Sequence, residues 1–241
     1  MLSVSNLSVQ FGKRVLFDEV NISFTKGNCY GIIGANGAGK STFLKILSGV
    51  LEPNSGSISL ETGKRMSVFE QNHNAFDSYP VLETVLRGNQ PLFKLKSEME
   101  SLYAKPDFSV IDGERVGVLQ GQYEEMDGWN AESEAASLLS NLEIGEDLHY
   151  NLMANIDGKQ KVRVLLAQAL FGRPDVLIMD EPTNDLDYET IVWLEQFLAD
   201  YDNTVIIVSH DRHFLDSVCT HISDIDFGKI SHFSGNYTFW Y

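Results

Sequence analysis

The run from Gly34 to Ser41, GANGAGKS, constrains this chain more than any other feature. An apolar segment precedes it over 29–33, and apolar residues on one face of a helix follow it over 43–47. The run fits the pattern G-x-x-x-x-G-K-S/T, whose glycines let backbone N–H groups converge on an anion with no Cβ in the way. The helix that follows presents its positive N-terminal end to the same anion. The pattern therefore predicts a phosphate-binding loop between a buried strand and a helix.

Two side chains at the end of this run indicate which phosphate compound the loop holds. Lys40 supplies a mobile cation for the β- and γ-phosphates of a nucleotide. Ser41 offers a hydroxyl group to Mg²⁺. The predicted ligand is therefore a nucleoside triphosphate with its Mg²⁺ ion.

Two apolar runs later in the chain end in polar side chains. Residues 176–179 precede Asp180 and Glu181, and residues 204–208 end shortly before His210. Ligands of parallel α/β sheets bind outside the carboxyl ends of the strands. We expect Asp180 to hold Mg²⁺ through water, Glu181 to polarise the attacking water and His210 to contact the γ-phosphate. The other histidines have no such context and are predicted to be structural: His73, His149, His213, His221 and His232.

Charge and cysteine content exclude several classes of protein. Eighteen Lys and Arg residues stand against 34 Asp and Glu residues, a net charge of −16, which disfavours naked DNA or RNA as a partner of the whole chain. Cys29 and Cys219 are too few for a disulfide scaffold or a zinc site, so we expect two buried thiols. The sequence has neither a membrane span nor a signal peptide, and the expected location is the cytosol.

The order of the elements predicts an α/β fold. Short strand candidates lie at 20–24, 29–33, 56–60, 65–69, 176–179 and 204–208, and helical periodicity dominates from about 81 until 170. Asp187 is placed to cap a further helix. Alternation of strands and helices favours a mainly parallel sheet with helices on its faces. We predict a nucleotide-binding core over 1–80 and 150–241 and a helical subdomain over 81–149.

Taken together, these motifs resemble the ATP-binding cassette (ABC) superfamily over nearly the whole chain. The resemblance implies a P-loop nucleotide-binding domain with a parallel core sheet, an antiparallel β subdomain and a helical subdomain, and an ATPase that uses ATP and Mg²⁺. It adds Gln71 as a ligand of Mg²⁺ and water, Phe11 as the aromatic that stacks on adenine, and 184–187 as the D-loop. The site residues it implies are, for catalysis, Glu181, His210 and Gln71; for the nucleotide, Phe11, Gly34, Ala35, Asn36, Gly37, Ala38, Gly39, Lys40, Ser41 and Thr42; and for the metal, Ser41, Gln71 and Asp180.

Within the superfamily, the ABC-F group of ribosome-associated factors is most similar, and within it the first cassette of YbiT-like proteins. Residues 180–187, DEPTNDLD, are close to that group's DEPTNHLD, and 161–170 and 234–237 match its patterns. The stretch from Gln71 to Asp157 is longer than in transporter cassettes. In ABC-F proteins this extra length is an arm that touches the ribosome, here about 87–127, with Arg87, Lys94, Lys96 and Lys105 beside Phe93 and Tyr103.

The resemblance also implies partners outside this chain. ABC-F proteins carry two cassettes, joined by a linker that reaches toward tRNA. The expected partners are therefore the ribosome, its rRNA and tRNA, and a second cassette in the same full-length chain. A single cassette is expected to bind ATP but to hydrolyse it slowly.

The signature segment departs from the family pattern. Where the family has LSGGQ or LSGGE, this chain has Ile156, then Asp157, Gly158, Lys159 and Gln160. In the family this segment binds the γ-phosphate held by the opposite cassette. Asp157 is expected to repel that phosphate, and Lys159 to compensate.

Two other functions share the same ATP site. The cytosolic ATPase of a membrane transporter is the main alternative, but the long insertion and Asn184 of the D-loop weigh against it. A chromosome or DNA-repair ATPase requires a long coiled coil between its halves, and no sustained heptads occur here.

Overall fold

The computed structural model describes residues 1–72 and 74–241, so His73, predicted to be structural, lies outside the described residues. The chain forms two compact units, Met1–Glu70 with Arg173–Tyr241, and Gln71–Gly172. The second unit is wider than the helical subdomain predicted over 81–149. Backbone hydrogen bonds explain part of this difference, because Val81 N–H donates to the carbonyl oxygen of Asn151. Residues on both sides of the predicted boundary are thereby tied together.

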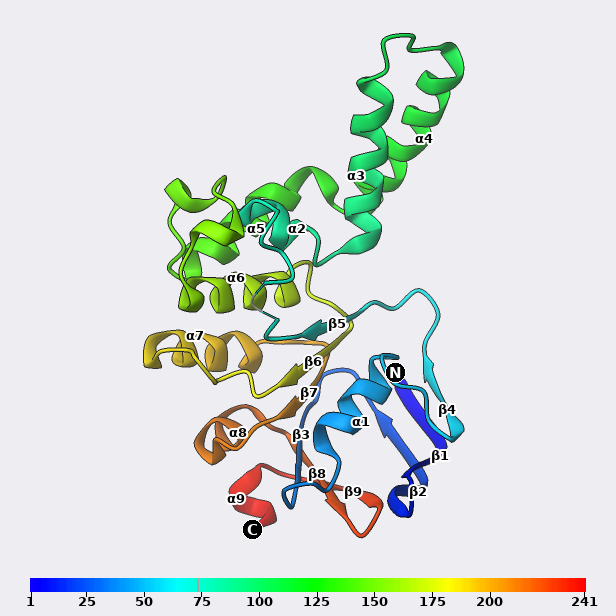
Figure 1. The fold of residues 1–241 in the computed structure, drawn as a ribbon, viewed down its shortest axis with the longest axis vertical. Helices are drawn as coiled ribbons and strands as arrows, with labels where there is room; N and C mark the ends of the chain where they lie inside the picture. The colour runs from blue at the N-terminus through cyan, green and yellow to red at the C-terminus, as the bar shows by residue number, and fades with distance from the viewer. Residues whose placement is uncertain (73) are drawn as a thin grey trace. The chain divides into compact units, whose positions relative to one another are not determined.

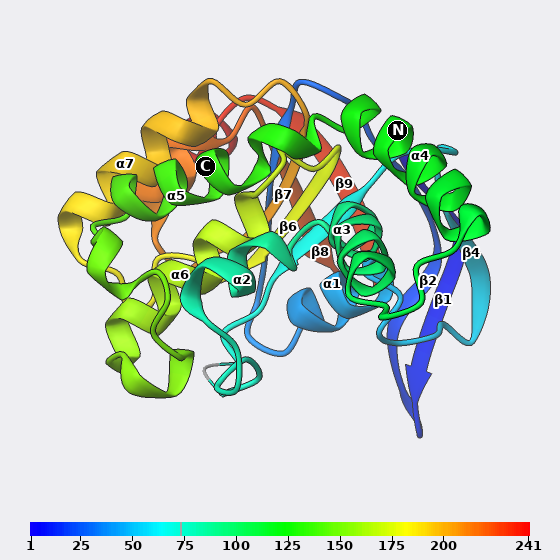
Figure 2. The same ribbon diagram turned by 90° about the horizontal axis from the view of Figure 1, so that it is seen from above.

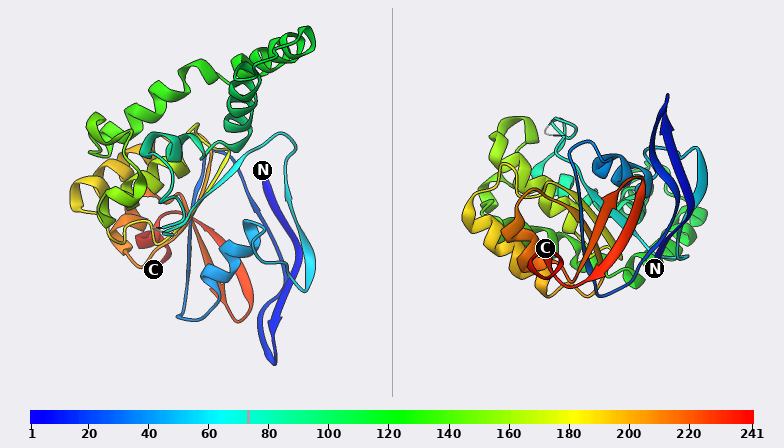
Figure 3. Two further views of the ribbon diagram at one scale, coloured as in Figure 1. Left: turned by 45° about the horizontal axis from the view of Figure 1, so that its top comes forward. Right: turned by 90° about the horizontal axis from the view of Figure 1, so that it is seen from below.

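The first unit is built on a six-stranded sheet of order β5-β6-β7-β3-β8-β9 (Figures 1 and 3). All neighbours pair in parallel except β8 and β9. The central strands are apolar along their length and buried, as strands covered on both faces must be. The predicted α/β class is confirmed. The strands are β3 Cys29–Gly34, β5 Met66–Phe69, β6 Val176–Asp180, β7 Thr204–Val208, β8 His221–Asp226 and β9 Lys229–Ser234.

A second, antiparallel sheet in this unit has the order β2-β1-β4. Its strands are β1 Leu2–Phe11, β2 Arg14–Phe24 and β4 Ser55–Leu60. Aromatic rings from this sheet pack on helix α1, Lys40–Leu47: the centroid of Phe43 lies 5.5 Å from that of Phe17 and 6.3 Å from that of Phe24. All three rings are fully buried, so they form the centre of the core around the start of α1.

Three helices complete the first unit: α7 Tyr188–Ala199, α8 Arg212–Val218 and α9 Tyr237–Trp240. Asp187 caps α7 as predicted, since its Oδ1 accepts a hydrogen bond from Thr190 N–H at 2.9 Å. The sulfur atoms of Cys29 and Cys219 lie 4.0 Å apart as buried free thiols, which confirms that prediction. Their hydrogen bond and their burial raise the pKa of Cys29 well above its ordinary value.

The second unit is helical. It contains α2 Val81–Leu86, α3 Gln90–Tyr103, α4 Val110–Glu125, α5 Ala131–Asn141 and α6 Gly158–Leu170, with short 3₁₀ turns η1 Gly128–Asn130, η2 Glu146–Leu148 and η3 Met153–Asn155. Helices α3 and α4 run side by side as a hairpin (Figures 1 and 2). This hairpin occupies most of the segment predicted to be an arm, 87–127. Helix α2 packs on α6, and Gly88, two residues after α2, lies so close to α6 that a Cβ there would overlap the carbonyl oxygen of Gln168.

Among the described residues, no helix is both long enough and apolar enough to cross a lipid bilayer.

The aromatic core yields a stability prediction. Substitution Phe43→Ala removes a fully buried ring and leaves a cavity against two other rings, so we expect a loss of about 3–5 kcal/mol in the free energy of unfolding. Val50→Ala is the matched control because Val50 is 66% exposed, and its effect should stay within about 0.5 kcal/mol. Urea unfolding followed by circular dichroism measures both. Equal midpoints for the two variants would contradict the assignment of the core.

A second prediction concerns acid. His232 packs on Phe24 and Tyr30, accepts from the Ser223 hydroxyl at Nδ1 and donates from Nε2 to the Ser23 carbonyl. Burial lowers its pKa below the ordinary value of 6.5. The unfolded chain therefore takes up this proton first, and the stability contribution of neutral His232 is lost as pH falls from about 6.5 through the folded pKa.

We therefore expect the urea midpoint of the parent chain to fall between about pH 7 and pH 5 by more than that of His232→Gln, which has no imidazole to protonate. Parallel pH profiles for the two chains would show that His232 does not titrate differently on folding.

Candidate functional site

The loop between β3 and α1 depends on glycine for its shape. Gly34 has φ of +147°, and a Cβ there would lie 2.7 Å from the Ile225 carbonyl oxygen. Gly39, the N-cap of α1, has φ of +105°, and its Cβ would meet the Phe17 ring at 3.0 Å. Any other residue would shift the loop at both places. The loop thereby holds the N-terminal N–H groups of α1 at the carboxyl edge of the sheet, where an anion can accept from them.

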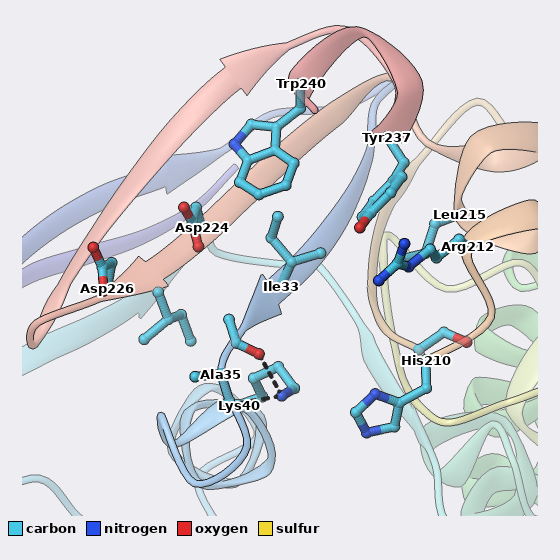
Figure 4. A pocket seen from close by; sticks show the side chains of 13 residues that line it. Ile33, Ala35, Lys40, His210, Arg212, Leu215, Asp224, Asp226, Tyr237 and Trp240 are labelled. Atoms are coloured by element: carbon cyan, nitrogen blue, oxygen red, sulfur yellow. Dashed lines mark hydrogen bonds between the residues drawn. The ribbon is translucent and has the colours of Figure 1, made fainter.

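Lys40 is the first residue of α1, and its side chain turns back over the loop (Figure 4). The ammonium Nζ donates to the carbonyl oxygens of Gly34 at 2.9 Å and Ala35 at 3.3 Å. Neither neutral acceptor cancels the charge. A cation and a helix N-terminus therefore meet at one point, the arrangement expected of a phosphate site.

Glu181 and His210 meet at the same edge of the sheet, as the sequence predicts. His210 N–H donates to Oε2 of Glu181 at 3.1 Å, and the His210 Nε2 lies 3.5 Å from Oε1. Glu181 itself has φ of +49°, in the left-handed region. Strained backbone of this kind at a strand end is typical of functional sites.

Asp180 provides a test of whether the site suits a metal ion. In the part of the chain that the structure describes, its Oδ1 is buried and accepts no hydrogen bond. Such an oxygen is normally satisfied, and a cation with its water would satisfy it. Within 1–72 and 74–241, no three His, Cys, Asp or Glu side chains gather into a metal-binding group. This donor set fits Mg²⁺, which is usually held by one or two carboxylates together with substrate phosphates.

A cavity of about 470 Å³ lies beside the loop and brings together most of the predicted site. The predicted residues that line it are Phe11, Asn36, Gly37, Gly39, Lys40, Ser41, Thr42, Glu181 and His210. Phe11 stands at the end of β1 with 52% of its surface exposed, so its ring is accessible to a ligand. The size falls in the range of small-molecule sites.

Sequence reasoning missed Arg14 in this cavity. Its guanidinium donates to the carbonyl of Gly37 at 2.5 Å, so it braces the phosphate loop from the start of β2. Because the acceptor is a backbone carbonyl, no residue type in the sequence marks the contact. The only available signal was a basic residue close behind Phe11.

A second cavity, of about 340 Å³, lies on another side of Lys40 and is drawn in Figure 4. Gly34 and Ala35 line it from the loop, and Arg212 and Tyr237 line it from α8 and α9. The guanidinium carbon of Arg212 lies 5.6 Å from the Tyr237 ring centre. Lys40 and His210 border both cavities, so each faces solvent from two directions.

The remaining predicted residues lie in or border other parts of the chain. Gln71 is the first residue of the second unit, and its role stays a prediction. Asp157 is the N-cap of α6: its Oδ1 accepts from Gln160 N–H at 2.9 Å, and the Gln160 side chain accepts from Asp157 N–H at 3.1 Å. Gly158 and Lys159 open that helix. The unusual signature thus forms a complete capping box.

The sequence matches the ABC transporter family over residues 17–184. It is 57% identical over 241 residues to the uncharacterized ABC transporter ATP-binding protein YkpA of Bacillus subtilis, covering 100% of this chain and 45% of YkpA. It is 49% identical over 237 residues to the probable ATP-binding protein YbiT of Escherichia coli, covering 98% and 45%. The predicted YbiT-like resemblance is confirmed.

A third relative is the energy-dependent translational throttle protein EttA of Mycobacterium tuberculosis, 34% identical over 231 residues, with 94% of this chain and 41% of EttA covered. The chain spans less than half the length of these curated relatives.

Solved structures agree with the fold. The ATP-binding subunit of an ABC transporter superposes with a TM-score of 0.74 at 18% identity, over 97% of this chain and 90% of that one. A dimeric ATP-binding cassette in a post-hydrolysis state with ADP and Pi superposes with a TM-score of 0.66 at 20% identity, over 97% and 98%. Cassettes of this family bind nucleotide and hydrolyse ATP, so the prediction of an ATPase is confirmed at the level of the family. By sequence and by fold alike, the chain belongs to the ABC family of ATP-binding cassettes.

Proposed function

We propose that this chain is the ATP-binding and ATP-hydrolysing cassette of an ABC-F protein that binds the ribosome in the cytoplasm and regulates translation. The observation that carries the ATPase part is a cavity beside the phosphate loop that Lys40, Glu181 and His210 all line. The translational part is supported by the likeness to EttA, whose name is that of a translational throttle protein, and by the helical hairpin of α3 and α4.

In this proposal the loop binds the phosphates and the first unit binds the base. Backbone N–H groups over 34–42 and the Lys40 ammonium hold the β- and γ-phosphates. Phe11 stacks on adenine, and Arg14 keeps the loop in shape through Gly37. Ser41, Asp180 and Gln71 would hold Mg²⁺, which would neutralise phosphate charge when bound.

Hydrolysis then needs a water held in line with the γ-phosphate. Glu181 accepts a hydrogen bond from that water and orients it, and the contact with His210 fixes the carboxylate. The imidazole of His210 is 68% exposed at its side chain, so it can donate to a γ-phosphate oxygen. The chemistry is positioning and charge stabilisation rather than covalent catalysis.

A second cassette is part of the proposal. The curated relatives are more than twice as long as the stretch they share with this chain. In the proposed pair, Asp157 to Gln160 face the γ-phosphate bound by the other cassette. Lys159 supplies the attraction there and Asp157 opposes it, so the second composite site is the weaker one.

The hairpin of α3 and α4 is the proposed ribosome contact. The competing function, the ATPase of a membrane transporter, uses the same ATP site and differs only in the partner. The experiment below therefore separates the two by where the protein is recovered.

Substitution Lys40→Ala should abolish nucleotide binding while the chain stays folded. Among the described residues, the Lys40 ammonium donates only to two loop carbonyls, so little of the fold depends on it. Titration with a fluorescent ATP analogue, with Lys45→Ala on the exposed face of the same helix as the control, measures the effect. Unchanged ATP affinity in Lys40→Ala would contradict the assignment of the phosphate loop.

Substitution Glu181→Gln in the full-length protein should keep ATP binding and lower turnover by about 100-fold or more, because the amide is a poor acceptor for the water proton. Glu189→Gln, an exposed carboxylate at the start of α7, is the matched control. Phosphate release measures turnover. A parental rate in Glu181→Gln would mean that another group orients the water.

The same Glu181→Gln protein tests the partner. With ATP, it should sediment with ribosomes from a cell lysate, and without ATP it should not. Recovery of the Glu181→Gln protein in the membrane fraction instead would be consistent with the ATP site but would favour a transporter role over the translational role.

A further inference from the structure

A cavity at the base of the α3–α4 hairpin takes no part in the proposed ATP site. It measures about 460 Å³ and is lined only by residues of α3, α4, η1 and α5 in the second unit. We propose that this cavity docks an arginine side chain of a basic protein. The proposal rests on the proposed function in one respect: it gives the hairpin's partner a chemical class, protein rather than nucleic acid.

Aromatic side chains form the walls. Trp129 and Tyr103 line the cavity with 62% and 56% of their surfaces exposed, and the side chain of Met99 lines it from a buried position. Tyr123 is buried and meets Trp129 edge to face, with ring centroids 5.1 Å apart at 86°. Exposed indole and phenol faces attract cations, and a planar guanidinium stacks on them best.

The walls are held in place before any ligand arrives. Asp127 has φ of +55°, which ends α4 and turns the chain back. A Cβ on Gly128 would lie 2.5 Å from the Tyr123 ring, so only glycine lets Trp129 follow so closely. On the other wall, Gln120 donates to the Tyr103 hydroxyl at 3.0 Å. A site fixed in this way loses little entropy when it binds.

The charges of the cavity select a cation. Glu100 and Glu132 outnumber the single ammonium of Lys96. Lys96 forms a close ion pair with Glu132 and lies 3.9 Å from Glu100. Burial alone would lower the pKa of Lys96, but the hydrogen bond and charge of Glu132 and the charge of Glu100 raise it above its ordinary value. Lys96 therefore pairs mainly with Glu132, and the more exposed carboxylate of Glu100 is available to pair with the guanidinium of a ligand.

The rest of the hairpin argues for a protein partner over RNA. Lys105 is paired with Asp112 at 2.5 Å, and Arg115 with Glu98 at 2.7 Å. In the described part of the chain, the exposed carboxylates Glu124 and Glu125 at the end of α4, which do not line the cavity, enter no ion pair.

Of the basic residues expected to touch rRNA, Lys96 and Lys105 are thus paired within the second unit, whereas the exposed Lys94 enters no ion pair among the described residues. Arg87 is likewise paired, with Glu83 at 2.6 Å. A surface of this kind attracts basic proteins and repels phosphate.

The test is peptide binding to the 241-residue chain at low salt, without ATP or ribosomes. The probe is a fluorescently labelled peptide of alternating glycine and arginine, compared with its match in which neutral citrulline replaces arginine. Fluorescence anisotropy should show that the arginine peptide binds and that Trp129→Ala and Glu100→Gln each weaken binding about fivefold. Both side chains are exposed, and thermal melting checks that each variant is folded.

Two matched controls distinguish binding in the cavity from non-specific electrostatic and hydrophobic binding to the surface. Glu125→Gln removes one carboxylate of the same hairpin outside the cavity, and Tyr150→Ala removes an aromatic ring of the same unit that is 80% exposed. Both should bind within about twofold of the parent, since neither touches the ligand. An equal loss of peptide affinity in Glu125→Gln and Glu100→Gln would mean that the peptide binds a diffuse acidic surface instead of the cavity, and would overturn the proposal.

Two further results would overturn it. The citrulline peptide could bind as tightly as the arginine peptide, or a single-stranded RNA could bind the chain and lose that binding in Trp129→Ala. Ribosome sedimentation is measured separately with the full-length protein. If the protein binds the peptide but does not sediment with ribosomes, the proposed function is wrong and the arginine-binding cavity stands. If it sediments with ribosomes but does not bind the peptide, only the proposal about the cavity is wrong.

Discussion

The parallel pairing of β6 with β7 and of β7 with β3 fixes where the phosphate loop, Asp180, Glu181 and His210 lie. Asp180 pairs with Val208, and Ile32 pairs with Val208 from the other side. The strand ends are therefore level, and the loop, the carboxylates and the histidine all emerge at one edge. The N–H of Glu181 donates to the Val208 carbonyl at 2.8 Å, which extends the pairing by one residue before the chain turns away. A slip of one residue would turn every side chain to the opposite face.

Local chemistry made most of the first unit predictable. Apolar runs identified β3, β6 and β7, and Asp187 marked the start of α7, because burial on both faces and helix capping each demand particular residue types. The hairpin of β8 and β9 was missed. Its turn places Phe227 and Gly228 at φ of +44° and +75°, and phenylalanine at the first position hides the usual Asn-Gly signal. Contacts to backbone, such as that of Arg14, leave no trace in a sequence.

The second unit shows how a substitution can preserve a fold while changing a charge. Serine and aspartate are both good N-caps, because each offers an oxygen to the first free N–H groups of a helix. Asp157 performs this task for α6, and Gln160 completes the capping box from the other side. Helix α6 therefore starts as well as it would with the serine of the family pattern. What differs is the electrostatic potential at its N-terminus, where a carboxylate now stands.

The two buried thiols of the first unit offer a way to measure how often this part of the structure opens. Cys29 lies on β3, and Cys219 is the C-cap of α8. Their exposed surface fractions are 5% and 6%. The raised pKa of Cys29 keeps it protonated, and a thiol reagent reacts with the thiolate. Alkylation at this position therefore waits until β3 and α8 separate. The rate of labelling would report how often α8 moves away from the strand that carries the phosphate loop, and a nucleotide that bound only the closed form would lower that rate.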